Sequence, residues 1–195
     1  KDTEQYHVCL AAPGLSRSDP RRFAASILDA ILGGSASSRL FQEIREKRGM
    51  AYAVYSFVSQ YTDTGQIGIY LGTREDNLGD ALAIAAEQIA DIAAGNVPSV
   101  ELERAKENLK GRILLSMEST STRMNRLGKS LITDSELMSL DRIVAEIDAV
   151  ETESVAELAG TLLAVDRLSA ACIGPSEERF RSALERITPT LSRAA

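Results

Sequence analysis

Segments with a strand-like pattern lie near both ends of this sequence, and a long series of helical patterns separates them. Residues 4–12 and 168–173 are short apolar runs of the kind that form strands. Residues 50–58 and 64–71 form another pair, and the five residues between them predict a β-hairpin. Because the first and last strands bracket the helices, we expect one α+β domain rather than two.

Between and after these strands, apolar residues recur every three or four positions, which is the spacing of an amphipathic helix. The predicted helices begin near residues 20, 40, 74, 98, 120, 140 and 152, and one more follows the last strand. We therefore expect residues 1–187 to form a single domain, with residues 188–195 as a frayed tail.

The charge balance and the lack of long apolar runs argue against two classes of function. The sequence holds 22 basic and 28 acidic residues, a formal net charge of −6, which argues against a surface for nucleic acid. No apolar run approaches the roughly 18 to 20 residues that span a bilayer. We therefore expect neither a nucleic-acid partner nor a membrane span.

The start of the sequence and its two cysteines bear on origin and location. The sequence opens Lys1-Asp2 without an initiator Met or a signal-peptide pattern, which predicts a fragment or a processed chain. Cys9 and Cys172 lie in apolar strand segments and are interpreted as buried free thiols in a reducing compartment. A disulfide between adjacent strands stays open at this point. We expect a cytoplasmic, bacterial protein.

The sequence contains one histidine, His7, and this limits its metal chemistry. A catalytic zinc site usually needs three protein ligands, and neither HExxH nor HxxEH can be formed around His7. We expect no metal and no cofactor in this chain, with His7 as a structural strand residue. A catalytic pair of His7 with Cys9 or Cys172 is the weaker alternative, because both cysteines lie among apolar residues.

The most distinctive run is GGSASSRLFQEIREKRGMAY, residues 33–52. Gly33-Gly34 is interpreted as a helix stop, and Gly49 as the C-terminal cap of a short helix. The run closely resembles the second-domain motif of zinc metallopeptidases of the insulinase and pitrilysin type (the M16 family), which includes mitochondrial processing peptidase. That motif has Gly-Gly, Ser-Arg-Leu, a helix with Arg-Glu-Lys, and Gly-x-x-Tyr opening a strand. The similarity is strong over residues 1–75 and diffuse beyond them.

The resemblance implies that this chain is the C-terminal, metal-free half of such an enzyme, with a mostly antiparallel sheet packed against several helices. In the family, two homologous halves face each other around a chamber, and the first half carries HxxEH. Zinc is therefore expected in that N-terminal half and not here. The implied partners are the zinc-binding half or a partner subunit, and a peptide substrate. A homodimer is a further expectation, since a lone half exposes a surface made for a similar fold.

The same resemblance assigns Arg45 and Tyr52 a supporting catalytic role, in peptide binding and oxyanion stabilisation. Arg45 comes near the end of the short helix and Tyr52 starts the next strand, so the turn at Gly49 can fold the tyrosine back beside the arginine. Both side chains offer donors that do not titrate near pH 7. Such donors can hold a peptide carbonyl and stabilise a developing oxyanion. The opposing interpretation is a solvated arginine and a tyrosine packed on the sheet.

The function predicted from these observations is the substrate-binding half of a zinc metalloendopeptidase that acts on peptides or unfolded segments. The fragment alone is expected to be inactive, because the HxxEH half is missing. The alternative is a non-catalytic scaffold or assembly subunit of the same family. One further cluster, Arg123, Arg126 and Lys129, is interpreted as a solvated stripe, with an anion site facing the chamber as the less favoured reading.

Overall fold

The computed structural model describes residues 3–187, so the predicted tail at 188–195 lies outside the described residues. One antiparallel sheet has the strand order β2-β3-β1-β4. Its strands are β1 (Tyr6–Gly14), β2 (Ala51–Gln60), β3 (Gly65–Thr73) and β4 (Ser169–Ile173). β1 pairs with both β3 and β4, so the strands from the two ends of the chain are neighbours. The predicted α+β class with an antiparallel sheet is confirmed.

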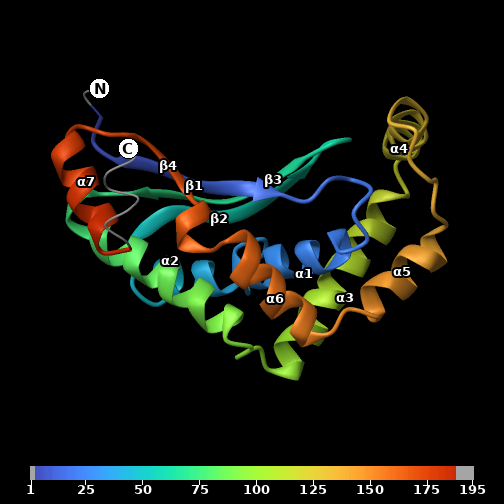
Figure 1. Ribbon diagram of the computed structural model, residues 1–195, viewed down its shortest axis with the longest axis horizontal. Helices are drawn as coiled ribbons and strands as arrows, with labels where there is room; N and C mark the ends of the chain where they lie inside the picture. Colours follow the sequence, from blue (N-terminus) through green and yellow to red (C-terminus); the bar gives the residue numbers. More distant parts are fainter. Residues whose placement is uncertain (1–2, 188–195) are drawn as a thin grey trace.

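The helices follow the predicted order along the chain. They are α1 (Arg22–Leu32), α2 (Leu78–Ala93), α3 (Ser99–Ser116), α4 (Thr120–Ile132), α5 (Leu140–Asp148), α6 (Thr152–Leu162) and α7 (Glu177–Glu185). Short 3-10 turns at Glu75–Asn77 and Val165–Arg167 lead into α2 and β4. Figure 1 shows α1, α2 and α6 on one side of the sheet, whereas α4 stands apart at the end of the molecule. None of the helices within residues 3–187 is long and apolar enough to cross a bilayer.

The hydrophobic core lies between the sheet and these helices. Val8 and Leu10 of β1 pair with Leu71 and Ile69 of β3, and all four side chains are buried. The helices supply the other half of the core, including Ile27, Leu28, Leu82, Ile92 and Leu158. Burying an aliphatic side chain of this size contributes about 1.5 to 3 kcal/mol. A one-residue shift in the pairing of β1 with β3 would expose these side chains, so their burial strongly favours the observed register.

The opposite face of the sheet is open in the described part of the chain (Figure 1). Tyr55 and Tyr70 lie opposite each other there, with their ring centroids 5.0 Å apart. The Tyr70 hydroxyl and Nδ1 of His7 are hydrogen-bonded at 2.6 Å, and His7 is an exposed strand residue. This face therefore carries an aromatic row with one histidine.

The two cysteines are free thiols, but both are half-buried and the prediction of full burial is wrong. Cys9 pairs with Tyr70 and so shares the open face. Cys172 pairs with Val8 and points to the core side, where a cavity beside Phe180 of α7 leaves it partly accessible. The two thiols therefore lie on opposite faces of the sheet. Burial raises the pKa of both.

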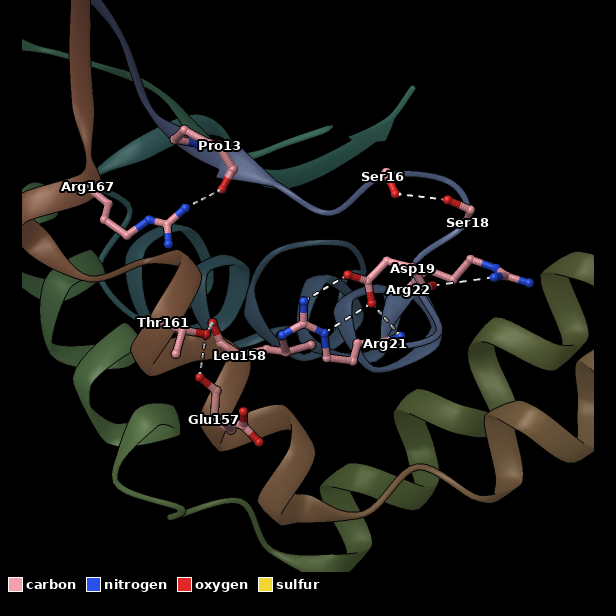
Figure 2. A network of polar contacts seen from close by, with 10 residues as sticks. All are labelled: Pro13, Ser16, Ser18, Asp19, Arg21, Arg22, Glu157, Leu158, Thr161 and Arg167. Atoms are coloured by element: carbon pink, nitrogen blue, oxygen red, sulfur yellow. Dashed lines mark hydrogen bonds and ion pairs between the residues drawn. The ribbon is translucent and has the colours of Figure 1, made fainter. Parts of the chain in front are cut away.

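The entry into α1 is held by Asp19, as Figure 2 shows. Its carboxylate accepts hydrogen bonds from the backbone N–H of Arg21 at 2.8 Å and from the Arg21 guanidinium at 3.1 and 2.8 Å. These bonds lower the pKa of Asp19. The helix begins at Arg22, two residues later than the predicted start at Pro20, because Asp19 stabilises a turn before the helix. Arg22 extends away from this carboxylate, to the opposite side from Arg21 (Figure 2).

Candidate functional site

The Gly33-Gly34 pair ends α1 against the middle of β2. The backbone N–H groups of both glycines donate to the carbonyl of Asp29, at 3.0 and 2.7 Å. A Cβ on Gly33 would lie 2.2 Å from the backbone nitrogen of Ser56, so only glycine fits. The Ser56 hydroxyl donates to the Asp29 carboxylate at 2.5 Å. The first part of the motif therefore fixes the chain to the sheet.

Arg39, from the Ser-Arg-Leu part of the motif, has a structural role. Its side chain is only 11% exposed and donates to Glu101 at 3.0 and 2.6 Å. It also donates to Asp91 and to the carbonyl of Asn96, both at 2.7 Å. These acceptors belong to the end of α2, the following turn and the start of α3. Arg39 thus fixes the chain just before the next segment, Phe41–Glu46, against α2 and α3.

The next segment, Phe41–Glu46, is a π-helix and not the α-helix that the sequence predicts. The backbone N–H of Lys47 donates to the carbonyl of Gln42, five residues back, at 2.9 Å. Single π turns of this kind occur frequently at functional sites. The wide turn keeps Ile44 buried while Arg45 reaches the surface. Gly49 then adopts a φ of +61°, which favours glycine, and ends the segment as predicted.

A β-bulge directs Tyr52 outward at the start of β2. Ala51 pairs with Thr73 and Ala53 pairs with Gly72, so Tyr52 is left without a partner in β3. Bulges re-aim side chains in this way. The Thr73 hydroxyl donates to the carbonyl of Met50 at 2.6 Å, which holds the strand entry. Tyr52 is 80% exposed and is therefore not packed on the sheet.

The structure brings Arg45 beside Tyr52. The guanidinium carbon of Arg45 lies 5.1 Å from the centroid of the Tyr52 ring and 4.8 Å from that of Phe41. Both distances fit cation–π contacts, which position the guanidinium without using its N–H donors. Within residues 3–187, Arg45 has no carboxylate partner. The pair therefore presents a positive charge and a phenol to solvent, and both can donate to a carbonyl oxygen.

The described residues do not fit a zinc site. Among residues 3–187, no three His, Cys, Asp or Glu side chains are grouped as metal ligands. His7 is engaged by the Tyr70 hydroxyl on the open face. The alternative Cys–His pair is not supported either. Cys172 lies on the core side of the sheet, away from His7, and His7 Nδ1 is already hydrogen-bonded to the Tyr70 hydroxyl. Burial also raises the pKa of both thiols, whereas a nucleophilic thiol needs a lowered pKa.

The motif and the fold agree with a known family. The model of the "Peptidase M16 inactive domain" matches residues 1–109. The chain belongs to this family. This M16 inactive domain is 42% identical over 184 residues to the uncharacterized zinc protease SCO5738 of Streptomyces coelicolor, covering 94% of the chain and 40% of that protein. It is also 42% identical over 176 residues to the uncharacterized zinc protease YmxG of Bacillus subtilis, covering 90% and 43%.

Solved structures show the same fold. The M16 inactive domain from Pseudomonas fluorescens is 29% identical, with a TM-score of 0.80 over 89% of this chain and 42% of that one. A protease from Helicobacter pylori shares the fold at 19% identity, with a TM-score of 0.79 over 90% of this chain and 43% of that one. The M16 inactive domain described here thus spans about two fifths of the length of the curated relatives that it matches.

Proposed function

We propose that this M16 inactive domain is the substrate-binding, metal-free half of a zinc metalloendopeptidase that acts on peptides or unfolded segments. The Arg45–Tyr52 pair supports this proposal, because a guanidinium 5.1 Å from an exposed tyrosine ring has its donors available to a ligand. In this role the two side chains hold a peptide carbonyl. They also stabilise the negative charge that develops on its oxygen in the transition state.

The position of β2 supports binding of an extended peptide. β2 is an edge strand, since it pairs with β3 alone in the described sheet. Its free edge offers backbone donors and acceptors to which a peptide can add as a further strand. Tyr52 lies at the start of this edge. We infer that the peptide backbone follows β2 while the Arg45–Tyr52 pair holds one of its carbonyl groups.

The zinc-binding groups belong, in this proposal, to an N-terminal half or a partner subunit. SCO5738 and YmxG are longer than this chain by more than half of their own length, which leaves room for such a half. Two surfaces are available to receive it: the open face of the sheet and α4. Self-association through the same surfaces stays a prediction, as does the cytoplasmic location.

The test is reconstitution of the enzyme from this chain, the zinc-binding half and zinc, followed by cleavage of a fluorogenic peptide. Arg45→Ala and Tyr52→Phe are each expected to lower turnover about 100- to 1,000-fold, the effect of removing one oxyanion donor. Arg48→Ala is the matched control, because Arg48 is exposed and paired with Glu43. Unchanged turnover in both site variants would show that the assigned roles are wrong.

A scaffold role is the second candidate, and α4 is the observation that favours it. Several apolar side chains of this helix are exposed, among them Met124, Leu127, Leu131 and Ile132. A surface of this kind fits a stable partner whether or not a peptide is cleaved. The same reconstitution separates the candidates: a stable complex of the wild-type chains with zinc bound but without peptide cleavage supports the scaffold.

A further inference from the structure

A cleft of about 610 Å³ lies at the end of β2 that is far from Tyr52. Gln60, the last residue of β2, lines it together with residues of the β1–α1 loop and of α1, α3, α4 and α5. Figure 1 shows the tip of the β2–β3 hairpin pointing toward α4, which stands over this region. The cleft is separate from the Arg45–Tyr52 pair but lies on the same strand.

Four cationic side chains line the cleft: Arg17, Arg22, Arg126 and Lys129. None of them forms a salt bridge within residues 3–187, and the arginines bond neutral acceptors. Arg17 donates to the carbonyl of Gln60 at 3.2 Å, and its Nε is buried without a partner. Arg22 donates to the sulfur of Met138 at 2.8 Å, and Arg126 donates to the carbonyl of the same residue.

The acidic side chains in and near the cleft do not balance these cations. Asp134 and Glu136 line it, and Glu136 is already paired with Arg142. Asp19 interacts with Arg22 from outside the lining, but its carboxylate is paired with Arg21. The positive charge is therefore concentrated in a hollow on a chain whose net charge is −6. A concave site with one sign of charge and low-dielectric walls focuses the field and attracts an ion of opposite charge. The cluster at Arg126 and Lys129, interpreted from sequence as a solvated stripe, forms part of this hollow.

A second cavity, of about 500 Å³, adjoins the cleft and shares Arg126 and Met117 with it. Four of its other lining side chains are leucines, and the remaining two, Glu118 and Arg123, carry opposite charges. The leucines are Leu114, Leu127, Leu137 and Leu140. A ligand held by its charge at Arg126 can therefore place an apolar side chain in the neighbouring cavity. This combination of an anion site and an apolar pocket fits a peptide better than a small inorganic anion.

We propose that the cleft binds a carboxylate of the peptide substrate, next to an apolar residue, about eight residues from the carbonyl held by Arg45 and Tyr52. The proposal rests on the proposed function. Tyr52 and Gln60 lie at opposite ends of β2, and eight residues of extended strand span about 26 Å. A peptide lying along β2 covers the same distance with the same number of residues. The carboxylate is either the peptide's C-terminus or an acidic side chain.

The test measures binding of fluorescein-labelled ten-residue peptides to this chain by anisotropy. One peptide ends in leucine with a free carboxylate, and its partner is amidated. Amidation is expected to weaken binding about tenfold, because charge-assisted hydrogen bonds are lost. An amidated peptide with glutamate or glutamine beside the leucine distinguishes the two sources, since only glutamate restores binding if a side-chain carboxylate is accepted. Equal affinity of all four peptides would overturn the proposal.

Variants of the chain locate the effect. Lys129 is exposed on α4, so Lys129→Gln should fold normally and weaken the free-acid peptide about two- to fivefold. The double variant Arg22→Gln with Lys129→Gln should remove most of the acid–amide difference. Arg104→Gln, an exposed arginine on α3 outside the cleft, is the matched control and should change nothing. An acid–amide difference that survives the double variant would place the carboxylate elsewhere.

This binding experiment is independent of cleavage. Arg45→Ala is expected to weaken the acid and amide peptides by the same factor, because it contacts the backbone. If Arg45→Ala and Tyr52→Phe leave binding unchanged while the double variant Arg22→Gln with Lys129→Gln still removes the acid–amide difference, the cleft is supported and the proposed function fails. If discrimination is absent while Arg45→Ala weakens both peptides, the proposed function is supported and the cleft proposal fails.

Discussion

Arg39 and Glu101 are joined by two hydrogen bonds, from Nε and Nη2 of the guanidinium to the two carboxylate oxygens, at 3.0 and 2.6 Å. Both side chains are mostly buried. The pair connects the motif loop to the start of α3, and the π-helix that carries Arg45 begins two residues later. This pair therefore gives the arginine of the motif loop a structural role, because it ties the loop to α3.

Replacing this arginine should lower stability more than a surface substitution would. Arg39→Ala leaves the Glu101 carboxylate without its partner, and breaking a buried pair in this way costs about 3 to 5 kcal/mol. Arg39→Lys keeps the charge but loses the bidentate geometry, so we expect it to recover only part of the loss. Urea unfolding followed by circular dichroism measures both. A loss below about 0.5 kcal/mol for Arg39→Ala would contradict the assigned role.

Replacing two of the glycines by alanine should change the stability of the fold in opposite directions. Gly33→Ala places a Cβ 2.2 Å from the backbone of β2, so we expect it to destabilise the fold by about 1 to 3 kcal/mol. Gly111→Ala lies inside α3 with no atom within 4 Å of the added Cβ, and should stabilise by about 0.5 to 1 kcal/mol. Thermal or urea unfolding of the two variants checks the signs. If both variants shifted stability in the same direction, the conclusion that Gly33 packs directly against the backbone of β2 would be wrong.

Much of this fold could be predicted from sequence, because strand alternation and helical spacing reflect burial on one face. The helix predicted to begin near residue 120 starts at Thr120, and the hairpin is at its predicted place. The π-helix could not be predicted, since buried Leu40 and Ile44 fit an α-helix equally well. The bulge at Tyr52 depends on pairing with β3, which a single strand pattern does not contain.

The cleft could not be predicted from the sequence for a different reason. Arg17 comes from the β1–α1 loop and Arg22 from the start of α1, whereas Arg126 and Lys129 come from α4, more than 100 residues later. Only the packing of α3 and α5 against α1, together with the placement of α4 between α3 and α5 in the chain, brings them to one cleft. In the sequence only the cluster of Arg123, Arg126 and Lys129 stands out, and this cluster alone is typical of a solvated surface. A charge surplus formed by distant segments is a tertiary property, so no local pattern predicts it.

The carboxyl group of Asp29 should make stability depend on pH. Burial raises its pKa, and the hydrogen bond from Ser56 opposes this only in part. The folded state therefore keeps its proton to higher pH than the unfolded state, whose pKa is about 3.9. The contribution of this group to stability is full below that value and is lost as pH rises through the folded pKa.

The Asp29→Asn variant isolates this effect, because asparagine keeps an acceptor for Ser56 but cannot ionise. Near pH 3 the two proteins should be about equally stable. As pH rises through the folded pKa of Asp29, the free energy of unfolding of the variant should become larger than that of the wild type. The measurement is urea unfolding of both proteins from pH 3 to pH 7, at constant ionic strength. A difference that stays constant over this range would show that the carboxyl group is not perturbed by burial.

Phe41 should influence peptide binding although it carries no polar group. Its ring lies 4.8 Å from the Arg45 guanidinium, on the π-helix, and together with Tyr52 it limits the positions that the guanidinium can adopt. Phe41→Leu removes this contact, and an exposed cation–π contact contributes about 0.5 to 1 kcal/mol. We therefore expect a two- to fivefold rise in KM in the reconstituted enzyme, whereas Phe41→Tyr should behave as the wild type. If Phe41→Leu and Phe41→Tyr had equal effects, the ring would serve only to fill space, and Arg45 would be positioned by Tyr52 alone.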